Sequence, residues 1–193
     1  MRAGNQAYWL APTRVKEHLK ELTRVAGDFA PALVELGRAH ADGVFATTDY
    51  KLARTCFEKA AAQGNAEAKF LLAKMRLRGW GEKASPEAIT EIRAMADQGM
   101  GEAAYYIGHL YYWGTKEAPG IVKDPAVAFK YIRLAAEKGH PQAVVNLALC
   151  YEHGIGTPVN YPLAAKVYWA AWELGYIEGR NRVRKLMGFV KID

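Results

Sequence analysis

The hydrophobic residues of this chain recur at steps of three and four positions, which is the spacing of an amphipathic helix and not of a strand. Four stretches share the pattern and each ends in a glycine: "ALVELGRAHADG" (32–43), "AKFLLAKMRLRG" (68–79), "AAYYIGHLYYWG" (103–114) and "AVVNLALCYEHG" (143–154). Each is followed by a turn and by a second stretch with helical spacing. The pattern therefore predicts four helical hairpins.

The second stretch of each hairpin ends in small residues followed by a glycine, at Gly64, Gly99, Gly139 and Gly175. These glycines are 35, 40 and 36 residues apart, and a period of this size is typical of helical repeat proteins. In the first stretch of each hairpin, a large aliphatic residue is followed by a position that holds only Gly or Ala. This small residue predicts that two helices approach each other closely.

Short polar residues stand where three of the second helices should begin. Asp49, Asp124 and Asn160 occupy equivalent positions, and their side-chain oxygens can accept hydrogen bonds from free N–H groups at a helix start. The second hairpin differs because its turn is one residue shorter. There we expect Ser85 to cap the helix, with Pro86 at its first position.

The turn "HGIGTPVNY" (153–161) places two glycines before a helix, as a phosphate-binding loop does. That fingerprint requires a strand before the glycines, whereas this turn follows a helical stretch. A similar turn, "RGWGEKAS" (78–85), stands in the second hairpin. We therefore interpret Gly154 as a left-handed residue that ends a helix.

A unit of about 36 residues with these alanine and glycine positions resembles the Sel1-like repeat, a longer relative of the tetratricopeptide repeat. The resemblance covers residues 29–175. It implies an all-α fold, a right-handed α-solenoid of four helical hairpins with repeats at 29–64, 65–99, 100–139 and 140–175. It also implies a scaffold for protein partners and does not name the partner.

The flanking segments are expected to be capping helices, because the end repeats of a solenoid would otherwise expose an apolar face. The N-terminal cap, residues 1–28, has an apolar side made of Val15, Leu19, Leu22 and Val25. The C-terminal cap, residues 176–193, is basic on one face and offers repeat four the side chains of Val183, Leu186 and Met187. Trp169 and Trp172 are expected to pack against this C-terminal cap.

Composition and charge indicate a cellular compartment and a class of partner. The 193 residues are 51% hydrophobic and 24% charged, and no stretch approaches the ~18 apolar residues that a membrane span requires. The N-terminus lacks the apolar run of a secretory signal, so we expect a cytoplasmic protein with no membrane partner. The formal net charge of +6 favours acidic partners. Cys56 and Cys150 lie in different repeats, too far apart for a disulfide, and are expected to be reduced thiols.

The candidates for chemistry are few. The histidines, His18, His40, His109, His140 and His153, do not show the spacing of metal ligands. The sequence contains no nucleophile-elbow serine, and neither cysteine has a cationic neighbour that would favour a thiolate. We therefore expect no metal site, no cofactor and no enzymatic activity.

By the resemblance, side chains of the first helices line a partner-binding groove. The predicted groove residues are Arg38, Phe70, Lys74, Tyr105, His109 and Tyr112, accompanied by Val34, Val145 and Leu149. Arg38, Lys74 and His109 share one position in successive repeats and form a predicted cationic row. Phe70 and Tyr105 flank that row and would supply apolar contacts.

These observations lead to two hypotheses of different classes. The first is a non-enzymatic scaffold or adaptor that binds a peptide or an acidic protein surface in this groove, a class that includes accessory and immunity factors. The alternative is nucleic-acid binding through Arg180, Arg182, Arg184 and Lys185. That alternative is weakened because residues 180, 182 and 184 spread around a helix. The oligomeric state stays open.

Overall fold

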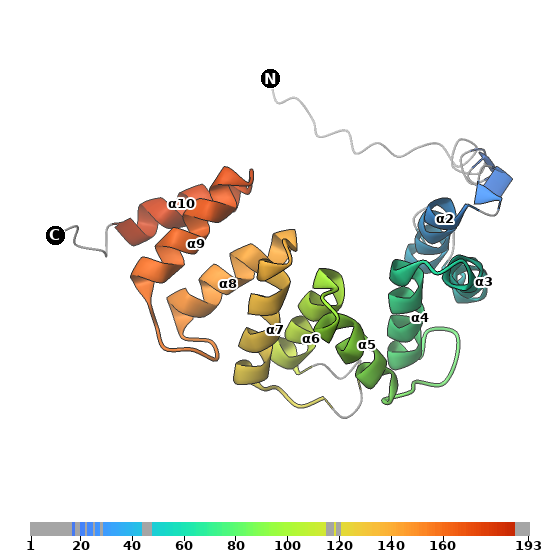
Figure 1. Cartoon of the computed structure of the whole chain (residues 1–193), viewed down its shortest axis with the longest axis horizontal. Helices are drawn as coiled ribbons and strands as arrows, with labels where there is room; N and C mark the ends of the chain where they lie inside the picture. Colours follow the sequence, from blue (N-terminus) through green and yellow to red (C-terminus); the bar gives the residue numbers. More distant parts are fainter. Residues whose placement is uncertain are drawn as a thin grey trace, which may run out of the picture. The chain divides into compact units, whose positions relative to one another are not determined.

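The computed structural model describes most of the predicted repeat region and the helix after it, and the residues it describes are 17, 20–21, 23–24, 26–27, 29–43, 48–114, 118 and 121–187. Within these ranges the chain forms helices and no strand, which confirms the all-α prediction (Figure 1). The helices are α2 (Ala30–Asp42), α3 (Tyr50–Ala62), α4 (Ala66–Arg78), α5 (Ala88–Asp97), α6 (Gly101–Trp113), α7 (Pro125–Glu137), α8 (Pro141–His153), α9 (Tyr161–Glu173) and α10 (Ile177–Met187).

The chain falls into two compact units. Unit 1 comprises residues 1–75 and 79–83, and unit 2 comprises residues 76–78 and 84–193. Helix α4 contributes to both, because its last turn belongs to unit 2.

In unit 1, helices α2 and α3 pack against each other at a glycine. A Cβ atom at Gly37 of α2 would overlap the ring of Phe57 of α3, and Phe57 is 1% exposed. The small residue therefore makes room for the largest buried side chain of the two helices. The turn after α4 is tied back to α3 by the ion pair between Arg54 and Glu82, at 2.6 Å.

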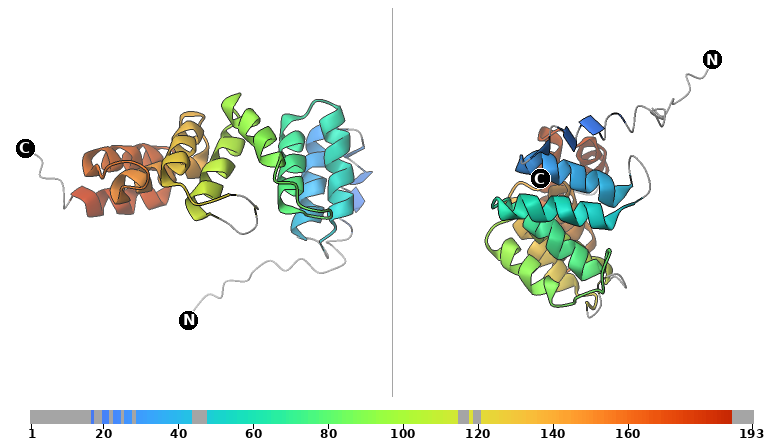
Figure 2. Two further views of the ribbon diagram at one scale, coloured as in Figure 1. Left: turned by 90° about the horizontal axis from the view of Figure 1, so that it is seen from below. Right: turned by 90° about the vertical axis from the view of Figure 1, so that its right-hand side faces the viewer.

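In unit 2, the consecutive helices from α5 to α10 pack side by side (Figure 1 and Figure 2). Helices α6 and α7 approach each other closely at Gly108, where a Cβ atom would lie 2.8 Å from Cγ1 of Ile132 and 3.0 Å from its backbone nitrogen. Ala148 occupies the equivalent position of α8 and is fully buried. The prediction that this Gly/Ala position permits close helix packing is confirmed.

The helix ends follow the capping residues in three repeats. Asp49 and Asp124 each accept hydrogen bonds from two backbone N–H groups at the start of α3 and α7, and Asn160 accepts one from Leu163 at the start of α9. Gly154 ends α8 with φ of 69°, in the left-handed region, as predicted. The turn "HGIGTPVN" is therefore a helix end and a connection.

The predicted cap of the second hairpin is wrong. Helix α5 begins at Ala88, and Pro86 lies in the turn before it. The Ser85 hydroxyl donates a hydrogen bond to the Glu87 carboxylate at 2.7 Å instead of capping backbone N–H groups. The backbone N–H groups of Ala88 and Ile89 donate to the carbonyls of Ser85 and Pro86, so these residues form a tight turn before the helix.

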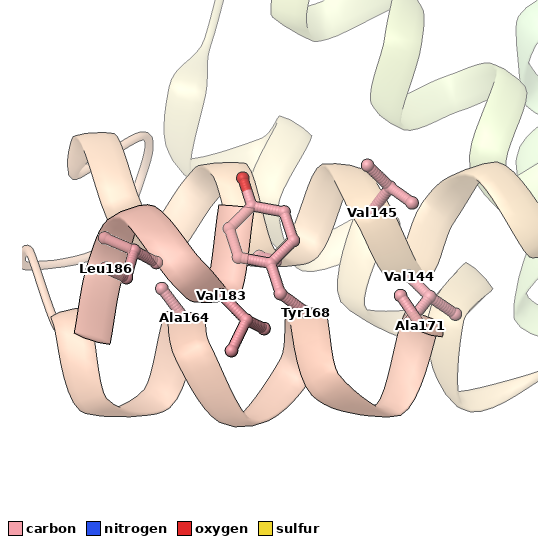
Figure 3. Packing of buried hydrophobic residues seen from close by; sticks show 8 residues of the cluster. Val144, Val145, Ala164, Tyr168, Ala171, Val183 and Leu186 are labelled. Carbon is pink, nitrogen blue, oxygen red and sulfur yellow. The ribbon is translucent and has the colours of Figure 1, made fainter. Parts of the chain in front are cut away.

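The C-terminal helix packs as predicted on the last hairpin. Val183 and Leu186 of α10 are buried in one apolar cluster with residues of α8 and α9, among them Tyr168 (Figure 3). Trp169 and Trp172 are 45% and 38% exposed, so neither indole is buried, and their packing against the cap stays a prediction. Their rings contact each other edge to face, with centroids 4.9 Å apart.

The N-terminal cap is only partly described. The described residues between 17 and 26 are helical, and Ala26 is buried. The predicted apolar side, Val15, Leu19, Leu22 and Val25, lies outside the described residues, as does the side chain of Met187. No helix in the described part of the chain has the length and apolar character that crossing a membrane requires.

Candidate functional site

The predicted groove positions separate into a buried column and a half-buried column. Arg38, Lys74, His109 and Leu149 occupy the same position in the four first helices, and all are half-buried. Four residues earlier, Val34, Phe70 and Val145 are buried, and only Tyr105 is half-buried. At 1% exposed, Phe70 belongs to the core, so its ring offers no groove surface. Of these two columns, the half-buried one therefore carries most of the accessible surface.

In unit 1, Arg38 and Lys74 lie around one small cavity of about 60 Å³, which Asp42 and Trp80 also line. The Arg38 guanidinium forms an ion pair with Glu67 on α4. The Lys74 ammonium lies 5.8 Å from the centre of the Trp80 ring, within the range of a cation–π contact. Part of the predicted cationic row is thus engaged within unit 1.

In unit 2, the predicted residues His109 and Tyr112 line a cavity of about 130 Å³. We call this cavity the aromatic pocket, and its lining residues are His109, Tyr112, Trp113, Ile132, Asn146, Leu149, Cys150 and Ile155. The Tyr112 and Trp113 rings meet edge to face with centroids 4.9 Å apart. Trp113 is 63% exposed and forms the accessible rim.

Tyr105 stands beside this pocket and is fixed by repeat four. Its ring stacks on His140 with centroids 4.2 Å apart, and its hydroxyl accepts a hydrogen bond from Asn146 at 3.4 Å. His140 in turn accepts a bond from the backbone of Ala143 and contacts the Glu102 carboxylate at 2.9 Å. Burial raises the pKa of the Tyr105 phenol, so the hydroxyl stays neutral. Tyr105 therefore joins α6 to the start of α8.

A second recess lies on the other side of α8. We call it the cap pocket, and its lining residues are Val145, Leu149, Tyr168, Asn181 and Arg182. Leu149 lines both pockets. The aromatic pocket is lined by residues of α6, α7, α8 and the turn after α8, whereas the cap pocket is lined by residues of α8, α9 and α10.

Two side chains that line the cap pocket, Tyr168 and Arg182, contact a buried carboxylate. Glu152 is 8% exposed, and its two oxygens contact the Tyr168 hydroxyl at 2.7 Å and the Arg182 guanidinium at 3.3 Å. The pKa of the Tyr168 phenol is raised, mainly by burial and next by its hydrogen bond to Glu152. Three helices, α8, α9 and α10, thus meet in one polar contact beneath the recess.

The cysteines are buried and free. Cys150 is 1% exposed at the base of the aromatic pocket, and burial raises its pKa to about 11. Burial also raises the pKa of Cys56 in unit 1. Both groups are therefore protonated thiols near neutral pH and poor nucleophiles.

The structure thus brings the predicted residues together in two groups. Arg38 and Lys74 share a cavity in unit 1, and His109, Tyr112 and the neighbouring Tyr105 form the other group in unit 2. The continuity of the row from one unit to the next stays a prediction.

The sequence prediction missed Trp113, Asn146, Glu152 and Arg182 as parts of the site. Helical spacing predicts Glu152 at a surface or turn, yet it is buried. The repeat alignment held a signal for it, because the equivalent positions are occupied by Ala41, Leu77 and Tyr112. A carboxylate in an otherwise apolar column indicates a buried charge with a dedicated partner.

The basic residues of α10 do not act as one group. Arg180, Arg184 and Lys185 are exposed, while Arg182 is paired with Glu152. The sequence of α10, "IEGRNRVRKLM", holds no aromatic residue that could stack on a base, and Phe189 lies outside the described residues. In the described part of the chain, no group of three metal-ligating side chains is gathered together.

Comparison with known proteins gives the repeats a family. The Sel1 repeat model matches residues 30–65, 66–88, 101–140 and 141–166, more than half of the chain. Mouse DAP3-binding cell death enhancer 1 is 37% identical over 109 residues, 55% of this chain and 20% of that protein. Mouse protein sel-1 homolog 2 is 38% identical over 88 residues, 45% of this chain and 12% of that protein. The Saccharomyces cerevisiae chitin synthase regulator SKT5 is 28% identical over 126 residues, 62% of this chain and 18% of that protein. The chain thus spans a fifth or less of these relatives.

Solved structures show the same fold. A Sel1 repeat protein from Oxalobacter formigenes aligns with a TM-score of 0.64 and 27% identity, over 86% of this chain and 66% of that one. A protective antigen of uropathogenic Escherichia coli that displays an SLR fold aligns with the same TM-score and 29% identity, over 86% of this chain and 35% of that one. The hairpins are those of an all-α solenoid, and the chain belongs to the Sel1 repeat family.

Proposed function

We propose that this protein is a non-enzymatic scaffold that holds a segment of a protein partner on the first-helix surface of unit 2. Sel1 repeat proteins generally serve as protein-interaction scaffolds. One relative is named for binding another protein and one for regulating an enzyme. The observation that carries the proposal is the aromatic pocket, an accessible recess built from side chains of two repeats.

The residues of that pocket suit binding better than catalysis. The lining is mainly aliphatic and aromatic, and its polar groups are the His109 ring, the Asn146 amide, the Tyr112 hydroxyl and the Trp113 indole N–H. Its single nucleophile is Cys150, whose raised pKa keeps it protonated. An exposed tryptophan beside an apolar recess is typical of the residues that dominate binding energy at protein interfaces.

The net charge of +6 and the lysine at the unit 1 cavity support a preference for acidic partners. Lys74, which lines this cavity, can steer an acidic segment through its positive charge. Such steering acts mainly on the association rate, whereas anchor contacts in a pocket act mainly on dissociation.

A variant at the rim of the pocket tests the proposal. Partner proteins would be captured from lysate with the full chain, and the contacting segment would be located by cross-linking and made as a labelled peptide. Trp113→Ala should weaken its binding by about thirtyfold, the equivalent of losing ~2 kcal/mol at a binding hot spot. Because Trp113 is 63% exposed, its removal should leave folding intact.

Two further variants complete the test. Trp169→Ala removes another partly exposed tryptophan, on α9 and outside the pocket lining, and should leave affinity unchanged. Lys74→Glu should slow association of an acidic segment with less effect on its dissociation. Equal binding by wild-type protein and Trp113→Ala would show that the segment binds elsewhere.

A further inference from the structure

We infer that the bound segment carries an apolar side chain and a carboxylate about three residues apart, the first entering the aromatic pocket and the second reaching Arg182 in the cap pocket. This inference rests on the proposed function and adds the chemistry of the partner. Three features support it: the size of one pocket, the charge of the other, and the helix that separates them.

The aromatic pocket has the size and lining for one apolar side chain. Its volume is about 130 Å³, close to the ~150 Å³ of an engineered apolar cavity that accepts benzene. Ile132, Leu149 and Ile155 provide aliphatic contacts, and the Tyr112 and Trp113 rings provide an edge-to-face pair that a third ring can join. A phenylalanine or leucine side chain suits this lining.

The cap pocket offers a fixed cation. The Arg182 side chain is 41% exposed, and among the described residues its guanidinium bonds only to Glu152, through one nitrogen. A guanidinium has five N–H donors, so donors remain for a carboxylate, which it can bind in a bidentate manner. The Asn181 amide lines the same recess and is exposed.

Glu152 fixes the position of the Arg182 guanidinium, and it is too buried to compete with a partner's carboxylate at the surface. It is 8% exposed, one oxygen is bonded to Arg182 and the other to the buried Tyr168 hydroxyl. The accessible part of the ion pair is therefore the guanidinium. Three exposed cations of the same helix, Arg180, Arg184 and Lys185, add to the positive potential around α10.

The spacing follows from α8, which lies between the pockets. Asn146 and Cys150 line the aromatic pocket, Val145 lines the cap pocket, and Leu149 lines both. Packed helices lie ~8–10 Å apart, and an extended chain advances ~3.3–3.6 Å per residue. A segment that crosses α8 therefore needs about three residues between its apolar side chain and its carboxylate.

Synthetic peptides test the inference with the full-length chain. The probes are fluorescein-labelled peptides in a Gly/Ser background that contain Phe-Ser-Ser-Asp or the reversed order Asp-Ser-Ser-Phe, with matched peptides in which Asn or Lys replaces Asp, or Ala replaces Phe. Fluorescence anisotropy gives each Kd. For one of the two orders, the Asp peptide should bind at least about tenfold more tightly than its Asn counterpart, and the Lys peptide more weakly still.

Substitutions at Asn181 change the charge of the cap pocket and leave the contact between Glu152 and Arg182 in place. Asn181→Asp should weaken the Asp peptide about tenfold with little effect on the Asn peptide, and Asn181→Lys should strengthen the Asp peptide. Arg184→Gln is the matched control, because it lowers the net charge of α10 by the same one unit at an exposed position outside the pocket. It should change Kd less than about twofold.

The outcomes separate this inference from the proposed function. If Phe peptides bind in a Trp113-dependent manner but bind equally with Asp, Asn or Lys, the carboxylate inference is wrong and the proposed function stands. The carboxylate inference is also wrong, and the proposed function again stands, if Arg184→Gln weakens the Asp peptide as much as Asn181→Asp does. If neither these peptides nor the captured partner's segment binds in a Trp113-dependent manner, both are wrong.

Discussion

Removing the hydroxyl of Tyr168 should destabilise the C-terminal end of the protein. Tyr168→Phe keeps the ring, which is fully buried among apolar side chains of α8, α9 and α10 (Figure 3). It deletes the hydrogen bond that the phenol donates to Glu152 at 2.7 Å. One oxygen of a carboxylate that is only 8% exposed then loses its hydrogen-bond donor and keeps only His153 Nε2, at 3.9 Å.

The expected magnitude is about 2 kcal/mol, because a hydrogen bond to a charged group contributes ~1.5–3 kcal/mol and a buried acceptor without a partner keeps its desolvation cost. For a chain of this length, each kcal/mol lowers Tm by ~2–4 °C, so thermal unfolding followed by circular dichroism should show a decrease of about 4–8 °C. Tyr151→Phe is the matched control. Its ring packs against Phe129, and it should change Tm by less than about 2 °C.

The pH dependence of the stability difference between wild-type protein and Tyr168→Phe provides a second test. The pKa of Tyr168 is raised in the folded protein above the ordinary tyrosine value of about 10. The stabilisation by its neutral phenol is therefore fully present below about pH 10 and is lost as the pH rises from there toward the folded-state pKa. The stability gap between wild-type protein and Tyr168→Phe should narrow over that range.

A double-mutant cycle with Glu152→Gln isolates the contact. Tyr168→Phe should cost less in the Glu152→Gln background, because the buried charge is already absent. A Tm decrease for Tyr168→Phe no larger than that for Tyr151→Phe, or a gap that widens above pH 10, would refute the assigned role of the hydroxyl.

Two further predictions concern packing. Gly→Ala in a helix interior usually stabilises by ~0.5–1 kcal/mol, but Gly108→Ala should destabilise by about 1–3 kcal/mol, measured by urea unfolding, because its Cβ would press on the backbone of Ile132. A stabilised Gly108→Ala variant would show that α6 and α7 are not in close contact there. Both thiols should react fast with an aromatic disulfide reagent in concentrated urea and slowly in native protein at about pH 8, Cys150 more slowly than Cys56 because it is more deeply buried. Fast native reaction of Cys150 would contradict its placement at the base of the pocket.

The parts of the fold that depend on near neighbours in the chain could be predicted from the sequence. A cap such as Asp124 satisfies N–H groups two or three residues away, and Gly154 ends its own helix, so each is determined within one turn. The Gly/Ala position of the first helices could be predicted equally well, because a period shared by four repeats identifies the face on which helices meet.

Burial could not be predicted in the same way, because it depends on which neighbouring helix covers a side chain. Tyr168 and Ala171 form the stripe of α9 that α10 covers, whereas Trp169 and Trp172 each follow one residue later. One residue turns a helix by about 100°, which carries both indoles away from the covered stripe. Phe70 shows the opposite error, since the column predicted as groove surface is core in unit 1.

The buried position of Glu152 links the stability of repeat four to the charge in the cap pocket. A buried ion pair gains little stability over apolar residues of the same size, because desolvation offsets the attraction between the charges. Leu77 fills the same column in repeat two and is fully buried, so an apolar residue satisfies the packing of this repeat type. The carboxylate instead fixes the position of the Arg182 guanidinium. One Glu152 oxygen accepts a hydrogen bond from Arg182, and the other accepts one from the Tyr168 hydroxyl. The same contact joins α10 to repeat four. The guanidinium that ties α10 to repeat four is therefore also the charge to which we propose that a partner's carboxylate binds.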